Sequence, residues 1–197
     1  MISWQAATML GIAFFSCGCA RANRDSGAQL ARERVVSSPS SIAYVSSERA
    51  VAGLSGEIRF GGPLGRSALY LKFPNEWRTK GPPRKAFLTL SPREGSASSD
   101  LPVTLEAWRV SADWQPQTLR QWSDKPSLAP PFARTRISAS PARELRIDVS
   151  ELLRFAAQNP ERDFGIAVIA SGSDGPGVTF STGLAGGQAP RLELYLR

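Results

Sequence analysis

Apolar and polar residues alternate with a period of two along several short segments after residue 40. In the last segment Leu192, Leu194 and Leu196 alternate with charged or aromatic residues, and residues 144–149 follow the same pattern. Successive side chains of a β-strand point to opposite faces, so this pattern predicts antiparallel strands with one face in water. Weaker segments raise the expected total to about nine strands. They are residues 42–45, 57–60, 67–73, 85–90, 103–110, 164–169 and 177–180.

Glycine, proline and serine cluster between the expected strands, at residues 61–63, 80–83, 93–96 and 171–176. The sequence has no helical crossovers of the kind that a parallel sheet requires. We therefore expect an all-β fold, an antiparallel β-sandwich of the jelly-roll type. Because the chain closes on a strong strand pattern at residues 191–197, deleting that segment should unfold the domain.

One segment departs from the period of two. Apolar residues recur at helical spacing from Val149 to Ala156, and residues 148–151 offer a capping box. Asn159 and Pro160 follow as a stop signal. The sequence therefore predicts one short amphipathic helix between two strands.

The 197-residue chain contains no histidine. That absence excludes Ser-His-Asp and Cys-His catalysis, histidine-ligated zinc and imidazole acid–base chemistry. The 24 basic residues outnumber the 17 acidic ones, for a formal net charge of +7, and nearly all of the basic residues are arginine. Because this charge is spread along the chain and not gathered in one stripe, we expect no nucleic-acid partner.

Two cysteines, Cys17 and Cys19, follow an apolar run at residues 9–15. The run is too short to span a bilayer, but it suits the hydrophobic region of a signal peptide. With a small residue before each cysteine, the stretch resembles the lipobox of bacterial lipoproteins, in which the cysteine becomes the lipidated N-terminus. Either cysteine fits that role, although the absence of Lys and Arg before Arg21 departs from the pattern. The alternative is a disulfide or a metal pair, for which the sequence supplies no further cysteine or histidine.

The lipobox resemblance divides the chain into three parts. Residues 1–18 are the expected lipoprotein signal peptide, residues 19–40 a flexible tether, and residues 41–197 the folded domain. The tether is rich in Arg, Ser and Ala and has no hydrophobic period. The residue after either cysteine is Gly18 or Ala20 and not Asp, which resembles lipoproteins sorted to the outer membrane. We therefore expect an exported protein of the cell envelope, held at a membrane by a lipid anchor.

Nine stretches of the folded part follow one another in a recognisable order. They are residues 43–45, 56–62, 67–73, 86–90, 110–114, 122–126, 147–153, 163–168 and 190–194. No single stretch is distinctive, but in this order they resemble the DNRLRE-type domains, also known from disaggregatase-related proteins, over residues 41–197. Two departures are Phe155, where the family has a tryptophan after the helix, and the weak acidic character of residues 115–118. The resemblance implies a β-sandwich module similar to carbohydrate-binding domains of secreted or cell-surface proteins.

Tryptophan and arginine are the candidate binding residues. An exposed Trp77 or Trp108 would offer a flat apolar surface for a sugar ring, whereas Trp114 and Trp122 bracket a proline-containing loop and are expected to plug the end of the sandwich core.

Arg59 and Arg66 flank a glycine pair and could converge on a carboxylate or phosphate. The alternative is that the arginines of the strands are solvated or paired with glutamates, namely Glu57, Glu106, Glu144 and Glu193.

Candidate catalytic groups are few. Asp113, Asp124, Asp163 and Glu161 are possible carboxylate catalysts, and the three tyrosines could serve a uronic-acid site. The alternative for Asp113, Asp124, Asp148 and Asp163 is local bonding to backbone N–H groups in turns and caps. A calcium site at residues 173–175 would lack enough oxygen ligands. We therefore expect no enzyme, no metal and no cofactor.

The sequence thus favours a non-catalytic envelope module that binds a glycan or cell-wall polysaccharide through aromatic and arginine side chains. A second hypothesis is a structural or assembly domain that contacts another envelope protein; it predicts buried tryptophans and an apolar patch on an outer sheet face. A polysaccharide-cleaving enzyme is a distant third.

Overall fold

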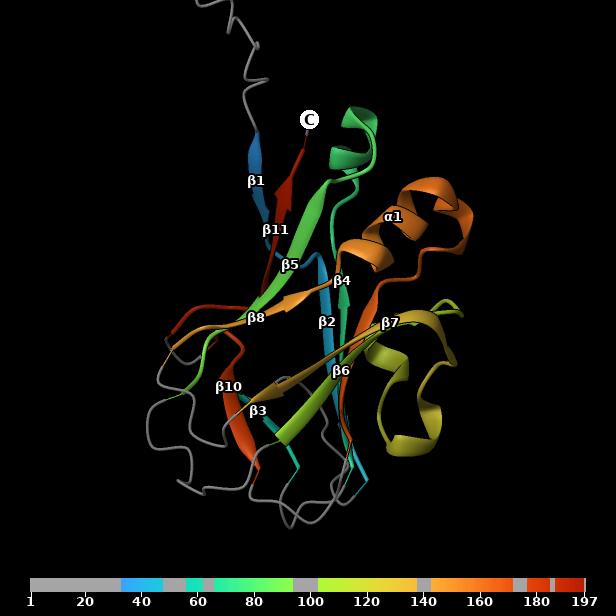
Figure 1. Cartoon of the computed structure of the whole chain (residues 1–197). Coiled ribbons are helices and arrows are strands. Elements are labelled where there is room, and N and C mark those ends of the chain that lie inside the picture. Colours follow the sequence, from blue (N-terminus) through green and yellow to red (C-terminus); the bar gives the residue numbers. More distant parts are fainter. Residues whose placement is uncertain are drawn as a thin grey trace, which may run out of the picture. The chain divides into compact units, whose positions relative to one another are not determined.

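The computed structural model describes residues 33–47, 56–61, 66–93, 103–137, 143–171, 177–184 and 187–196. In these segments the chain forms eleven strands, one α-helix and four short 3₁₀ turns (Figure 1). The strands are β1 (Arg34–Ser37), β2 (Ser41–Ser46), β3 (Glu57–Phe60), β4 (Ser67–Lys72), β5 (Lys85–Leu90), β6 (Val103–Val110), β7 (Leu128–Ile137), β8 (Leu145–Asp148), β9 (Ile166–Ser171), β10 (Val178–Ser181) and β11 (Arg191–Tyr195). The helix is α1 (Ser150–Gln158), and the 3₁₀ turns span Glu76–Lys80, Pro116–Thr118, Trp122–Asp124 and Pro160–Arg162.

The strands pack as two antiparallel layers. One is a five-stranded sheet in the order β2-β4-β9-β6-β7, and the other has the order β1-β11-β5-β8. The pair β10-β3 adjoins the four-stranded sheet where the Ser181 N–H donates to the Ser91 carbonyl oxygen at 2.9 Å. The chain changes layer at most connections, as it does in a jelly roll. The expected antiparallel β-sandwich is confirmed.

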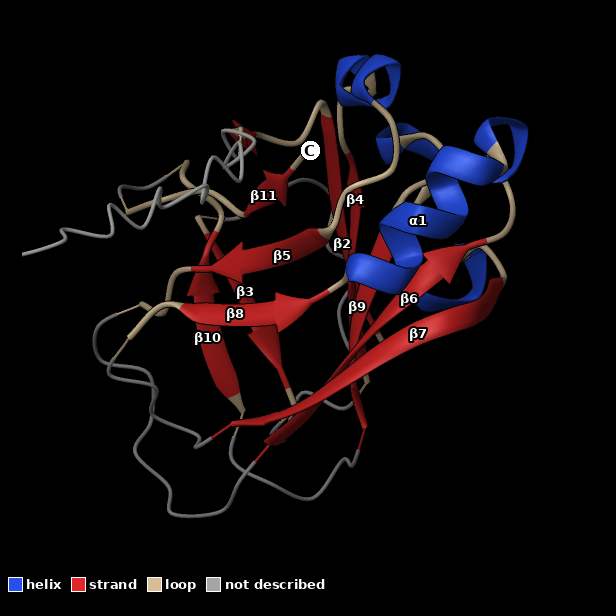
Figure 2. Cartoon of the chain, turned by 45° about the horizontal axis from the view of Figure 1, so that its top comes forward, coloured by secondary structure: helices blue, strands red, loops and turns tan. Residues whose placement is uncertain are grey.

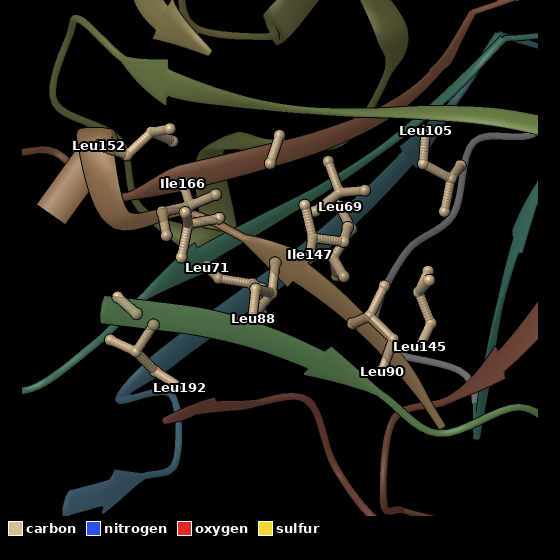
Figure 3. Close-up of a cluster of buried hydrophobic side chains, with 14 of the residues drawn as sticks. Leu69, Leu71, Leu88, Leu90, Leu105, Leu145, Ile147, Leu152, Ile166 and Leu192 are labelled. Atoms are coloured by element: carbon tan, nitrogen blue, oxygen red, sulfur yellow. The ribbon is translucent and has the colours of Figure 1, made fainter. Parts of the chain in front are cut away.

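The main core lies between the layers and is built from the apolar side of each alternating strand. Leu69 and Leu71 of β4 meet Leu88 and Leu90 of β5 across the sandwich, and Leu192 of β11 joins them (Figure 3). All five side chains are fully buried. Burial of this many aliphatic side chains is the main contribution to the stability of the sandwich.

A second apolar cluster covers the outer face of the five-stranded sheet. Tyr70 and Ala68, which alternate with the core leucines of β4, face away from the main core and pack with Trp114 and Leu119. The segment after β6 carries these two residues and folds back over the sheet through its two 3₁₀ turns (Figure 2). Strand β4 is therefore buried on both faces.

The N-terminal strand corrects the expected domain boundary. The tether was expected to run to residue 40, but Arg34–Ser37 forms β1 and pairs along its length with β11. An edge strand needs only one neighbour, so a short segment with a weak apolar pattern can take this place. The folded domain therefore begins before residue 41.

Strand β7 is the second element that the sequence did not predict. Its Pro130 and Pro131 argue against a strand, because proline cannot donate a backbone hydrogen bond. β7 is the edge strand of its sheet, and both prolines lie where its register against β6 shifts, between Ala129 and Phe132. Residues at such an irregularity are not paired in the hydrogen-bond ladder, so proline there removes no ladder hydrogen bond.

The predicted helix is confirmed at residues 150–158, but its expected capping box does not form. Val149 occupies the N-cap, and the carboxylate of Asp148 accepts hydrogen bonds from the Ser150 backbone N–H and hydroxyl. The Ser150 hydroxyl oxygen in turn accepts the Ala86 N–H at 3.0 Å. The start of α1 is thus tied to β5, which fixes where the helix leaves the sheet.

Strand β11 lies between β1 and β5, so we predict that the protein cannot fold without it. Deletion of residues 191–197 should abolish the cooperative unfolding transition, measured by circular dichroism during heating.

Leu194→Ala should lower the free energy of unfolding by about 2–5 kcal/mol, because it leaves a cavity in the core. Leu184→Ala is the matched control; this leucine is 65% exposed, and the expected change is below about 0.5 kcal/mol. Equal losses for the two leucine variants would contradict the prediction.

Candidate functional site

The outer face of β6 and β7 carries a small group of aromatic and charged side chains. Leu105 and Ala107 of β6 point into the core, so their neighbours Glu106 and Trp108 point outward. In the register of the two strands Glu106 lies opposite Arg134, and Trp108 lies opposite Phe132. Alternation and strand pairing together place these four residues in one patch, which we call the aromatic platform.

Two stacked rings form the apolar part of the aromatic platform. The centroids of Trp108 and Phe132 are 4.1 Å apart, and their planes differ by 12°. Trp108 is half-buried, whereas Phe132 keeps 42% of its surface exposed. Large apolar side chains with this exposure are few in the described part of the chain, where only Val36 and Leu184 join Phe132.

A buried carboxylate holds the charged part of the aromatic platform in place. Glu106 is only 5% exposed and accepts the Trp108 indole N–H at 2.9 Å and the Arg134 Nη2 at 2.6 Å. The Arg134 Nε donates to the same carboxylate oxygen at 2.8 Å. Two charge-assisted bonds restrict the guanidinium, which remains largely exposed to solvent.

Arg109 fixes the strand irregularity beside the aromatic platform. Its side chain points to the other face of β6, is 8% exposed, and donates to the Pro130 carbonyl oxygen at 3.0 Å. The guanidinium lies 4.4 Å from the ring centroid of Phe155 on α1. Burial, with a smaller contribution from the nearby Arg162, lowers the pKa of Arg109. This contact holds the segment that leads directly into Phe132.

Trp77, the other tryptophan expected to bind a sugar, is buried. It is 5% exposed because the 3₁₀ turn Glu76–Lys80 folds its ring into the main core. The guanidinium of Arg78 lies 5.6 Å from its ring centroid. The expectation of an exposed Trp77 is therefore wrong. The sequence showed only that Trp77 follows a strand in a loop, and a loop position does not determine whether the tryptophan ring is buried or exposed.

The arginine pair Arg59 and Arg66 forms no site among the described residues. Arg66 is exposed at the start of β4, and Arg59 is half-buried on β3 with an Nε that has no hydrogen-bond partner in the described segments. Ser67 donates its hydroxyl to the Arg59 carbonyl oxygen at 2.8 Å, so the two backbones are close. No described contact joins the two guanidinium groups, and their convergence stays a prediction.

The alternative expectation for the arginines is confirmed at all four glutamates. Each of them forms an ion pair across neighbouring elements, and Glu193 pairs with two arginines at once. Outer strand faces carry these pairs, so most strand arginines are already occupied. The pairs are Arg93–Glu57, Arg134–Glu106, Arg191–Glu144, Arg34–Glu193 and Arg146–Glu193.

Trp114 and Trp122 act as a cover and do not face solvent as a pair. Trp114 is 4% exposed, lies 5.7 Å from the Tyr70 ring, and donates its indole N–H to the Phe164 carbonyl oxygen at 2.7 Å. Trp122 packs at the edge of the same cluster. The expected core role is confirmed, although these rings cover an outer sheet face and not the end of the sandwich.

The aspartates perform the local duties that were the alternative to catalysis. Each accepts a backbone N–H one to four residues away: Asp113 from Trp114, Asp124 from Arg120 and Gln121, Asp148 from Ser150, and Asp163 from Gly165. Hydrogen bonds from Lys72 and the Trp114 N–H lower the pKa of Asp113. The described segments hold no group of three or more Cys, Asp or Glu side chains that could bind a metal. Residues 173–175, weighed for calcium, lie outside the described residues.

A second surface, which sequence reasoning missed, lies where β5 begins and β11 ends. Arg84, Lys85, Phe87, Tyr195 and Leu196 line a hollow of about 280 Å³ there. They come from two segments, residues 84–87 and 195–196, that are more than one hundred positions apart in the chain, and the pairing of β5 with β11 brings the segments together. In the sequence, the basic pair Arg84-Lys85 at the start of a strand was the one feature that could have pointed to this surface.

Comparison with models of known protein families finds none that matches this chain, and comparison with curated proteins finds no match. In the described segments no helix has the length and apolar character needed to cross a membrane. Cys17 and Cys19 lie outside the described residues.

Asp148 gives a pH-dependent prediction. Burial disfavours its charged form, but hydrogen bonds from Ser150 and Lys85 outweigh burial and lower its pKa. A carboxyl with a depressed folded-state pKa contributes stability that is complete above about pH 5 and is lost as the pH falls through the folded pKa. Asp148→Asn should therefore destabilise the protein at neutral pH and make it less sensitive to acid, measured by urea unfolding across pH. Glu161→Gln, at an exposed site, is the control; a neutral-pH loss as large as that of Asp148→Asn would contradict the role of the hydrogen bonds.

Proposed function

We propose that this chain is a non-catalytic module that binds a glycan, such as a cell-wall polysaccharide, at the aromatic platform. The observation that carries the proposal is the stacked Trp108–Phe132 pair, partly exposed beside a fixed carboxylate and guanidinium. Sugar rings present C–H groups on one face and hydroxyls around the edge. They therefore bind where an aromatic surface adjoins polar groups with restricted positions.

The parts of the aromatic platform have separate roles in this proposal. The exposed surface of Phe132, backed by Trp108, packs against the C–H face of a sugar. The indole N–H is already bound to Glu106, so Trp108 contributes stacking and rigidity. The guanidinium of Arg134 remains open to solvent and donates to hydroxyl or acidic groups of the chain. A flat patch at a sheet edge suits a long polymer better than an enclosed small molecule. The resemblance to DNRLRE-type domains supports the same class of ligand.

We also propose that the module is exported and held in the cell envelope by lipid on Cys17 or Cys19. The support is the sequence around the cysteines together with the start of the fold at β1. The sequence places about 14 residues between Cys19 and Glu33, and a flexible coil of that length would extend on average about 20 Å. This length keeps the sandwich next to the membrane, where envelope polysaccharide is within reach.

Polysaccharide retention tests the glycan proposal. The full chain, without lipid, should be retained by at least one insoluble glycan in a panel of peptidoglycan and neutral and acidic polysaccharides. Trp108→Ala should reduce the retained fraction about tenfold, because the loss of a stacked aromatic contact removes roughly 1–1.5 kcal/mol of binding. Thermal unfolding of the same samples shows whether the variant is folded.

Trp122→Ala is the matched control, since it removes a tryptophan of similar burial from a different surface. It should leave retention unchanged. If the folded wild-type chain binds none of the glycans, the proposal is wrong and an envelope protein becomes the partner to identify. If added salt removes retention and Trp108→Ala does not change it, the binding depends on arginine charge and not on aromatic stacking.

The lipid anchor has its own test. In a bacterial host that modifies lipoproteins, the chain should incorporate a labelled fatty acid and partition with membranes. One of the variants Cys17→Ala and Cys19→Ala should lose the label completely, while the other keeps it. Labelling that survives in the double variant, or that is absent from the wild-type chain, would contradict the anchor.

A further inference from the structure

The hollow at the junction of β5 and β11 combines apolar walls with positive charge. The rings of Phe87 and Tyr195 meet edge to face at 6.1 Å, and the buried Leu196 contributes further apolar surface. Arg84 and Lys85 line the same space, and both are exposed. A site of this composition favours a ligand with a ring that packs on apolar surface and a group with negative charge.

The cationic groups around this hollow are incompletely neutralised. None of the ion pairs among the described residues involves Arg84. Lys85 pairs with Asp148 at 2.9 Å, but both side chains are about half exposed. Exposed pairs contribute little stability, so an incoming anion can share the ammonium group at small cost.

Tyr195 supplies a third donor of a different kind. Its hydroxyl oxygen lies 3.4 Å from the Arg146 Nη2, which is within reach to donate to it. The tyrosine's own O–H proton therefore remains available. Arg146 also lies 4.2 Å from the ring centroid of Phe87 and donates to Glu193 at 2.8 Å, so it is held in place behind the ring.

We propose that this hollow binds a single sugar ring that carries a phosphate. Phosphate has three acceptor oxygens and nearly two negative charges, so it can be shared by a guanidinium, an ammonium and a hydroxyl. A carboxylate has two oxygens and one charge, and it is satisfied by one guanidinium alone. The hollow's volume of about 280 Å³ lies just below the usual range for ligand sites, about 300–1,000 Å³, which suits a ligand no larger than one ring.

The position of the hollow agrees with a ligand at a membrane surface. Arg34, at the start of β1, is paired in register with Tyr195, and the Leu196 N–H donates to the Glu33 carbonyl oxygen at 2.9 Å. The chain therefore enters the fold directly beside the hollow. If the proposed lipid anchor is correct, phosphorylated sugars of membrane glycolipids come within reach; the binding chemistry itself does not depend on the anchor.

Titration calorimetry with glucose 6-phosphate tests the site on the full chain produced without lipid. Binding should be measurable for glucose 6-phosphate, much weaker for glucuronate, and absent for glucose. Arg84→Gln should weaken it about tenfold, as expected for loss of a charge-assisted hydrogen bond. Tyr195→Phe should weaken it less, because only the hydroxyl is lost. Sedimentation with phosphatidylcholine vesicles, with and without lipid A, tests the membrane-borne source, since lipid A carries phosphates on glucosamine rings.

Arg143→Gln is the matched control, because Arg143 is an exposed arginine just before β8, near the far end of β5. This variant should bind glucose 6-phosphate and lipid A vesicles as the wild-type chain does. The proposal is overturned if neither glucose 6-phosphate nor lipid A vesicles bind, if glucuronate binds as tightly, or if Arg84→Gln and Arg143→Gln behave alike. Trp108→Ala should leave sugar-phosphate binding intact, so failure of the aromatic platform and failure of this hollow give different results.

Discussion

Burial of β4 on both faces is the constraint on which the rest of the structure depends. Leu69 and Leu71 require a second sheet on one side, and Tyr70 requires a cover on the other. The segment between β6 and β7 supplies that cover with Trp114. This segment packs over β2, β4 and β9, and the aromatic platform lies on the part of the same outer face that β6 and β7 form.

The outer faces of the two sheets share a second feature, a nearly buried glutamate that accepts hydrogen bonds from arginine. Glu106 belongs to the aromatic platform, and Glu193 lies between Arg34 and Arg146 near the hollow. A carboxylate with this little exposure is costly unless charged donors satisfy it. Arginine suits the task because its planar fork donates two bonds at once and its face packs on Phe87 or Phe132. The abundance of arginine therefore has a structural use on these sheets.

The sequence predicted most strands because their apolar residues alternate, and it predicted α1 because its apolar residues recur at helical spacing. It did not predict β1 and β7, since an edge strand needs few apolar residues and tolerates proline. Among the site residues, Trp108 was named only as a candidate, and its outward position follows from its alternation with Leu105 and Ala107 on β6. The same reasoning could not place Trp77 in a 3₁₀ turn. The partnership of Phe87 with Tyr195 depends on a pairing between distant strands, which local patterns do not encode.

The adjacency of Glu33 and Leu196 also has a mechanical consequence. When the N-terminal segment is pulled away from β11, the hydrogen bonds between β1 and β11 are loaded one after another, beginning beside Glu33. β1 has four residues and packs on one neighbour only, so it detaches before any strand that is buried on both sides. Release of β1 adds about 13 Å of extended chain to the N-terminal connection and leaves the remaining strands paired. A domain anchored at its N-terminus and bound to a polymer would therefore yield at β1 under tension, and the aromatic platform on the other sheet would stay assembled.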